Sequence, residues 1–188
     1  MSDPTEELDG YRRLVATRDV IVCCGTGGVG KTTTAAATAM AAAAMGRRAA
    51  VVTIDPAKRL ADALGIDRLH NDATIIDGPW PGTLGALMLD TKATFDDVVR
   101  RHAKSEKQAE RIFANRFYEN ISTTLSGTQD YMAVEKLAEL HSSGEWDLVV
   151  VDTPPTRDAL AFLEAPKLLT RLLDNAIYKI LISPSQGC

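Results

Sequence analysis

The segment that most constrains how this chain can fold is the loop of residues 25–32, which reads Gly-Thr-Gly-Gly-Val-Gly-Lys-Thr. It fits the pattern G-x-x-x-x-G-K-[ST] in full, between an apolar run at residues 20–24 and an alanine-rich helical pattern at residues 31–45. In such a loop the glycines let backbone N–H groups point at phosphate oxygens, and the following helix adds its positive N-terminal end. An ordinary glycine-rich turn is the alternative, and it would not need the flanking strand and helix. The segment therefore predicts a phosphate-binding loop in an α/β protein.

The residues of this loop are the candidate ligands of a nucleotide. Lys31 is expected to reach the β and γ phosphates, and so to act in catalysis as well as in binding. Thr32 is expected to supply a hydroxyl to Mg²⁺, as the last residue of such loops does. The residues predicted to bind the nucleotide are Gly25, Thr26, Gly27, Gly28, Val29, Gly30, Lys31, Thr32 and Thr33.

Three further apolar, β-branched runs predict buried strands, at residues 49–54, 84–89 and 148–151. Helical patterns fall between them, at residues 91–103, 105–121 and 129–141. Strands that alternate with helices favour parallel pairing through right-handed crossovers. The predicted fold is therefore an α/β P-loop NTPase, with a mostly parallel sheet flanked by helices in three layers (α/β/α). Ligands are expected at the carboxyl ends of the strands.

The length of 188 residues suits one sizeable core and is too short for two ordinary domains. We predict a single P-loop ATPase domain over residues 19–188, with a helical insertion at about residues 91–143, after an N-terminal extension of residues 1–18. The first 19 residues carry acidic side chains and no apolar run, so they are neither a secretory signal nor a membrane anchor. A cytoplasmic protein is expected.

Charge and cysteine usage argue against several classes of protein. The 21 basic residues are scattered among 25 acidic ones and the net charge is -4, which is not the footprint of a nucleic-acid binder. Cys23 and Cys24 are adjacent in the first predicted strand, Cys188 is the last residue, and no zinc or disulfide spacing occurs. The three histidines are dispersed. We predict no nucleic-acid partner and no transition metal.

Two carboxylates follow predicted strands and are expected beside the nucleotide. Asp152 comes after residues 148–151 and is predicted to hold Mg²⁺, directly or through water, because this ion prefers hard oxygen ligands. Asp55 comes after residues 49–54 and is predicted to be catalytic, orienting or deprotonating the water that attacks the γ phosphorus. Because Pro56 follows it, Asp55 is also a candidate N-cap of a helix. Both roles are compatible with the sequence.

Residues 25–33, Asp55-Pro56 and residues 152–156 together resemble the deviant Walker A ATPases, and most closely the arsenite-pump and tail-anchored-protein-targeting family. Residues 160–166, Leu-Ala-Phe-Leu-Glu-Ala-Pro, repeat the layout that follows the last motif in that family. Within the family the chain is most similar to the actinobacterial anion-transporter ATPases. The resemblance implies that ATP is the substrate and Mg²⁺ the cofactor, that Asp55 is the water-activating residue of switch I, and that residues 152–156 form switch II.

The resemblance also implies a function. ATP hydrolysis would drive a dimer cycle coupled to an anion transporter or to a membrane or client protein, in the cytoplasm or at the inner face of the membrane. The dimer would form with a second copy or with a related ATPase subunit. A nucleotide-gated binding or targeting module with incidental turnover is the alternative, and a partitioning-type ATPase is another. An iron-protein reductase needs cluster-binding cysteines, and arsenite capture needs converging thiols; the cysteines of this chain favour neither.

Three departures from the family pattern matter. Thr26 stands where the family has a lysine that reaches the partner's nucleotide, so slow intrinsic hydrolysis and a heterodimer with a lysine-bearing subunit are expected, and Arg157 is the candidate substitute in this chain. Arg157-Asp158 also replaces the Gly-His that follows switch II. Family chains are longer, so an N-terminal fragment without the adenine-binding loop is expected. An apolar stripe at residues 168–181 predicts core packing or a client groove.

Overall fold

The computed structural model describes residues 4–55, 58–115, 118 and 129–154. The described chain divides into two compact units. The first contains residues 4–55, 58–89 and 137–154, and the second contains residues 90–115, 118 and 129–136.

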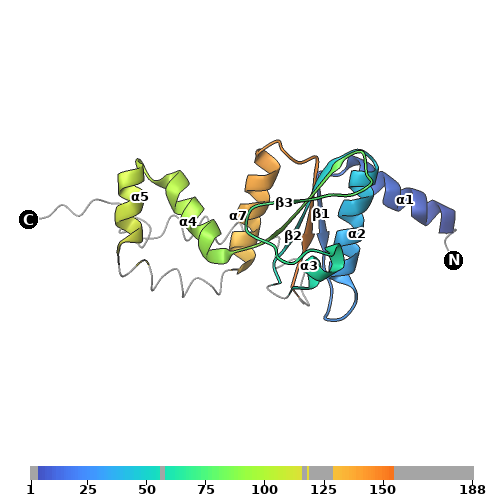
Figure 1. Ribbon diagram of the computed structural model, residues 1–188, viewed down its shortest axis with the longest axis horizontal. Coiled ribbons are helices and arrows are strands. Elements are labelled where there is room, and N and C mark those ends of the chain that lie inside the picture. The colour runs from blue at the N-terminus through green and yellow to red at the C-terminus, as the bar shows by residue number, and fades with distance from the viewer. Residues whose placement is uncertain (1–3, 56–57, 116–117, 119–128, 155–188) are drawn as a thin grey trace, which may run out of the picture. The chain divides into compact units, whose positions relative to one another are not determined.

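A five-stranded sheet forms the centre of the first unit (Figure 1). Its strands lie in the order β1, β5, β2, β4, β3. The first three pairings are parallel, and β3 is antiparallel to β4. The strand bounds are Val20–Cys23 for β1, Arg48–Thr53 for β2, Thr74–Ile76 for β3, Thr83–Met88 for β4 and Leu148–Asp152 for β5.

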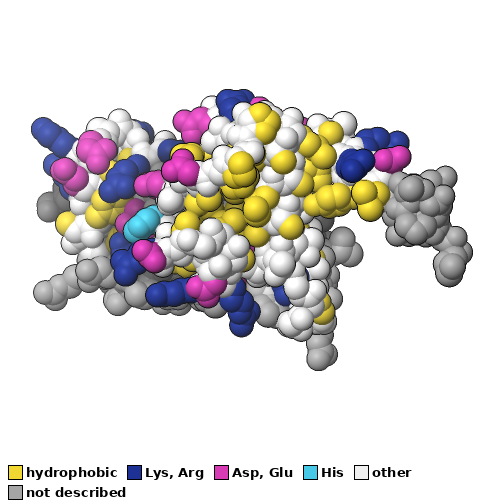
Figure 2. Space-filling model, turned by 45° about the vertical axis from the view of Figure 1, so that its right-hand side comes forward, with side chains coloured by type: hydrophobic (Ala, Val, Ile, Leu, Met, Phe, Trp, Pro, Cys, Tyr) yellow, Lys and Arg dark blue, Asp and Glu magenta, His cyan; other side chains and the backbone are white. Residues whose placement is uncertain are grey.

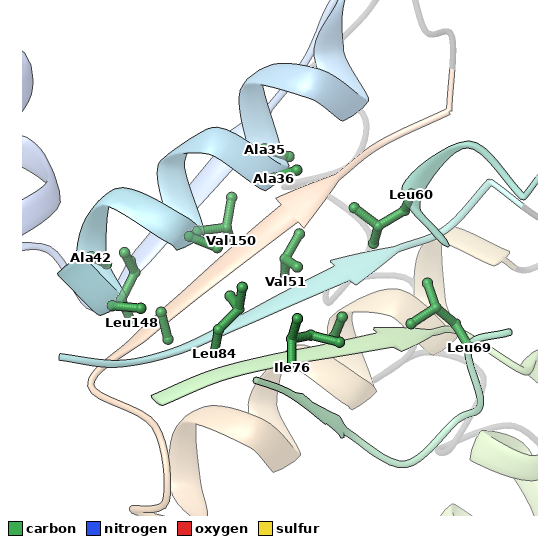
Figure 3. Close-up of a cluster of buried hydrophobic side chains, with 14 of the residues drawn as sticks. Ala35, Ala36, Ala42, Val51, Leu60, Leu69, Ile76, Leu84, Leu148 and Val150 are labelled. Carbon is green, nitrogen blue, oxygen red and sulfur yellow. The ribbon is translucent and has the colours of Figure 1, made fainter. Parts of the chain in front are cut away.

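The central strands are buried on both faces, which is what a parallel sheet requires. Every residue of β5 is buried, and so is every residue of β2 after Arg48. Helix α2, Lys31–Ala44, packs against this sheet with alanines, among them Ala35 and Ala42 (Figure 3). Because alanine is small, the helix backbone comes close to the strands, and the first turn of α2 is held at their carboxyl ends.

Two further helices also belong to the first unit. In α1, Pro4–Thr17, Val15 is buried in the same core, and the Tyr11 hydroxyl donates to Thr38 Oγ1 of α2 at 3.0 Å. In α3, Arg59–Leu64, Leu60 and Ala61 are buried in that core as well. Helix α3 is therefore fixed next to the loop that follows β2.

The second unit is helical. It contains α4, Thr91–His102, α5, Glu106–Phe113, and the beginning of α7, Gln129–Ser142, a helix that runs on into the first unit. The first two helices begin at N-cap side chains, since Asp90 accepts from Ala93 N–H at 2.9 Å and Ser105 caps α5. Their apolar faces form a small cluster with Tyr118, which contains Val99, Ile112, Phe95 and Phe113 as well.

Apolar surface is also exposed in the first unit. Large hydrophobic side chains that remain exposed include Leu8, Tyr11 and Leu14 of α1 and Met40 of α2. Figure 2 shows a face on which hydrophobic side chains lie among charged ones. Exposed apolar side chains are common in folded proteins. In the part of the chain that the structure describes, no helix is both long enough and apolar enough to cross a membrane.

The predicted fold is confirmed: the sheet is mostly parallel and helices flank it. All four predicted strands are present, but the short antiparallel β3 was not predicted. The predicted helix at residues 105–121 is wrong in length, because α5 ends at Phe113. Cys24 was placed in the first strand, but β1 ends at Cys23 and Cys24 is exposed. The stripe at residues 168–181 lies outside the described residues, and the predicted domain division stays a prediction.

Candidate functional site

Three neighbouring strands end at the same edge of the sheet and bring the predicted site residues together. In the parallel register, Asp152 at the end of β5 is level with Cys23 of β1 on one side and with Thr53 of β2 on the other. The glycine-rich loop begins just beyond Cys23, and Asp55 lies just beyond Thr53. The sheet therefore places Asp152 between the loop and Asp55.

The loop after β1 has a conformation that requires glycine. Gly28 and Gly30 have φ angles of 79° and 86°, in the left-handed region that residues with a Cβ rarely adopt. Gly30 is also the N-cap residue of α2, and no side chain caps the helix there. The first-turn N–H groups of α2 are thus left to other acceptors, which is the usual property of an anion site at a helix N-terminus. Lys31 Nζ donates to the Thr26 carbonyl oxygen at 2.9 Å, across the loop.

A cavity of about 710 Å³ opens over this loop. This volume is within the range of small-molecule sites, roughly 300 to 1,000 Å³. Two cations, Lys31 and Arg59, and one carboxylate, Asp62, face it. The described residues that line it are Gly27, Gly28, Gly30, Lys31, Thr32, Thr33, Arg59, Asp62 and Ala63. Most of the predicted nucleotide ligands therefore share one hollow, and α3 supplies the rest of its wall.

Asp152 lies under the loop, and its side chain is held by two hydroxyls. Its Oδ2 accepts from Thr32 Oγ1 at 2.8 Å and from Thr53 Oγ1 at 3.1 Å. Only 1% of the residue is exposed, and its other carboxylate oxygen, Oδ1, is buried without a hydrogen-bond partner. Burial raises the pKa of the Asp152 carboxyl, although both hydrogen bonds and the charge of Lys31 favour the ionised form.

These residues fit a magnesium ion. A buried polar oxygen without a hydrogen-bond partner is uncommon in a folded protein. One explanation for such an oxygen is that it binds an ion. The groups that meet here are a carboxylate and a hydroxyl, which are the hard oxygen ligands that Mg²⁺ prefers. Thr32 and Asp152 are therefore the residues that would hold it, and Thr53 would orient the carboxylate by its hydrogen bond.

Asp55 has different surroundings. Its carboxylate forms an ion pair with Arg59, with 3.0 Å between Asp55 Oδ2 and Arg59 Nη1, and its backbone N–H donates to Thr53 Oγ1 at 3.2 Å. The Asp55 side chain is 19% exposed and that of Arg59 is 65% exposed. Helix α3 begins at Arg59 with Lys58 at the N-cap position, so Asp55 is not the N-cap residue of this helix.

Sequence reasoning missed three residues of the site: Thr53, Arg59 and Asp62. Arg59 stands only four residues after Asp55 and has the opposite charge, and this signal was available in the sequence. Asp62 lies one turn further along the same short helix. Thr53 gave no signal, because a threonine in an apolar strand is also an ordinary β-branched residue. Arg157, the candidate substitute for the missing lysine, lies outside the described residues.

The sequence is similar to known ATPases over most of its length. It matches the family described as Anion-transporting ATPase over residues 18–183. It is 29% identical over 153 residues to ATPase GET3 of Malassezia globosa, an alignment that covers 81% of this chain and 44% of that protein. It is 27% identical over 150 residues to ATPase get3 of Aspergillus terreus, with 79% of this chain and 43% of that protein covered.

This chain thus aligns with less than half the length of these curated relatives. The family match itself includes the glycine-rich loop, Asp55 and Asp152. The family predicted from the motifs is confirmed, and the chain belongs to the anion-transporting ATPase family.

Proposed function

We propose that this protein is a Mg²⁺-dependent ATPase whose hydrolysis drives a nucleotide-switched dimer cycle, coupled to an anion transporter or to a membrane or client protein. The observation that carries the proposal is the contact between Thr32 and Asp152 under the glycine-rich loop. This contact joins the hydroxyl of Thr32, a residue that lines the cavity, to the buried carboxylate of Asp152. Magnesium and the phosphates of one nucleotide would meet there.

The residues of the loop would bind and orient the triphosphate. Its N–H groups and the first turn of α2 would hold phosphate oxygens, and Lys31 would leave the Thr26 carbonyl for the β and γ phosphates. Bound at Thr32 and Asp152, Mg²⁺ would neutralise charge that develops on the phosphate oxygens. Asp55 would orient the attacking water and accept its proton.

We also propose that the protein acts as a dimer with ATP as its nucleotide. The relatives that the chain resembles are named ATPase GET3 and ATPase get3, which supports ATP as the nucleotide. Thr26 is exposed in the loop, and a threonine side chain cannot supply the cation that the family's lysine supplies across a dimer. This favours a heterodimer with a related subunit that carries the lysine over a homodimer of two equal sites.

A nucleotide-gated binding module is the second candidate, and the same Thr26 favours it, because the absence of a cation at this position would make turnover slow. The two functions differ in their response to a partner. A coupled ATPase must hydrolyse ATP faster when its membrane partner or client is added, whereas a passive module need not respond. A steady-state rate measured with and without membranes from the source cell separates them.

The proposal is tested by measuring ATP binding and phosphate release by the wild-type protein and by Lys31→Ala. We expect Lys31→Ala to abolish detectable binding of a fluorescent ATP analogue, because the loop loses its cation at the β and γ phosphates. Lys107→Ala is the matched control, since Lys107 is an exposed lysine of α5 in the other unit. Unchanged affinity in Lys31→Ala would refute the assignment of the loop.

A further inference from the structure

Arg59 is the second cation of the phosphate cavity and comes from a different element than the first. Lys31 belongs to the start of α2, while Arg59 stands at the start of α3, on the chain that leaves β2. Its guanidinium is bound to the Asp55 carboxylate at 3.0 Å. The residue thus connects the group proposed to activate water with the space proposed to hold the γ phosphate.

The ion pair between Arg59 and Asp55 is weak enough for Arg59 to exchange this carboxylate for another anion. The Arg59 side chain is 65% exposed, and exposed ion pairs contribute little to stability because water screens them. A guanidinium has five N–H donors in a planar fork, which suits phosphate oxygens in a bidentate arrangement. A terminal phosphate carries more charge than one carboxylate. A triphosphate in the cavity would therefore compete well for the guanidinium.

We propose that Arg59 is a γ-phosphate-binding residue that exchanges the Asp55 carboxylate for the terminal phosphate when a triphosphate enters the cavity. This inference rests on the proposed ATPase function. Without a triphosphate, the guanidinium is paired with Asp55. With a triphosphate, the guanidinium moves to the γ-phosphate oxygens and no longer pairs with this carboxylate. Substrate binding and release of Asp55 from the ion pair are then one event.

In the proposed hydrolysis, these residues act on the water and on the γ phosphate. The water oxygen bonds to the γ phosphorus, and the bond between this phosphorus and the oxygen that bridges it to the β phosphorus breaks, so that ADP leaves with the electron pair. The water proton passes to the Asp55 carboxylate and then to the phosphate product. Arg59 meanwhile binds the equatorial oxygens, where negative charge is spread in the transition state.

The inference predicts a selective effect on triphosphates. We expect Arg59→Ala to weaken the binding of a non-hydrolysable ATP analogue by about tenfold while ADP binding is unchanged, since only the analogue has a γ phosphate. Single-turnover hydrolysis should fall by about a hundredfold, the scale of losing one preorganised charge donor. Arg59→Lys should restore part of both effects because it keeps the charge and loses the fork. Arg68→Ala, an exposed arginine outside the cavity lining, should behave as wild type.

A second background separates phosphate binding from mere positioning of Asp55. In Asp55→Asn the guanidinium has lost its charged partner, so triphosphate affinity should rise above that of wild type, and adding Arg59→Ala should remove the gain. If Arg59 only positioned Asp55, Arg59→Ala would change nothing in that background. That result, or equal losses for ADP and the analogue, would overturn the inference while the ATPase proposal stands. A wild-type protein that binds neither nucleotide would instead overturn the proposed function and this inference with it.

Discussion

The ends of β5 and β2 lie side by side and present one carboxylate each, yet the two carboxylates have opposite surroundings. Asp152 is the last residue of β5, is 1% exposed, and is held at one oxygen by two hydroxyls. Asp55 lies beyond the end of β2, with a side chain that is 19% exposed and paired to an exposed arginine. The same edge of one sheet thus provides one fixed carboxylate and one with an exchangeable partner.

The difference follows from where each residue stands on its strand. Asp152 is still in register with both neighbouring strands, so its backbone cannot shift without disturbing two ladders. Asp55 is past the ladder, where the chain turns toward α3. Rigid placement suits an ion ligand, which needs fixed geometry. A group that must exchange partners during a reaction needs the looser position.

The largest effect is expected for Asp55→Asn. The substitution keeps the shape of the side chain and removes the base, so turnover should fall by about a hundredfold or more while Mg-ATP remains bound. Turnover is measured as phosphate release at saturating ATP, and binding is measured with a fluorescent analogue. Normal turnover would mean that Asp55 has no part in the chemistry and that the contrast between the two carboxylates is only structural.

A smaller effect is expected for Thr53→Val, which has nearly the same shape as wild type. The hydroxyl of Thr53 donates to Asp152 Oδ2 and accepts from the Asp55 N–H, so it touches both strand ends. Losing a group that orients a metal ligand typically costs about tenfold or more in metal affinity. We therefore expect the Mg²⁺ concentration for half-maximal hydrolysis to rise by about tenfold. A change in the maximal rate alone would place Thr53 with Asp55 instead.

The smallest effect is expected on stability. Asp152→Asn replaces a buried carboxylate whose Oδ1 has no hydrogen-bond partner by a neutral side chain of the same shape. Without nucleotide and Mg²⁺, the variant should be more stable by about 1 kcal/mol, which raises Tm by roughly 2 to 4 °C for a protein of this size. Thermal melting of the two proteins in EDTA checks this. A lower Tm would show that the carboxylate is already satisfied in the nucleotide-free protein.

The parts of the fold that the sequence predicted are those in which local pattern and final packing agree. Four strands and the helix after the loop came from apolar, β-branched and alanine-rich runs. Strands β2, β4 and β5 are largely buried as expected, whereas every residue of β1 is only partly buried. Strand β3 has three residues and pairs antiparallel at the edge of the sheet, which is too short for periodicity to detect. The end of α5 at Phe113 has no glycine or proline to mark it.

The candidate site also contains residues that could be predicted from the sequence and residues that could not. The loop and Asp152 carry motifs whose spacing along the chain is enough to find them. Arg59 and Asp62 enter the cavity only because α3 is packed against the core through Leu60, and that packing is a tertiary property. The hydrogen bond between Thr53 and Asp152 joins residues that are 99 positions apart and depends on the strand order. Such a contact can be predicted only when the order of the strands in the sheet is known.

The different roles of the two carboxylates can be checked by measuring ATP affinity with Mg²⁺ and with EDTA, for wild type, Asp55→Asn and Asp152→Asn. In the proposed site the ion is held by Asp152 and not by Asp55. Mg²⁺ should therefore strengthen ATP binding by wild type and by Asp55→Asn, and this gain should be lost in Asp152→Asn. If Asp152→Asn keeps the gain, or if Asp55→Asn loses it, the division of roles between the two strand ends is contradicted.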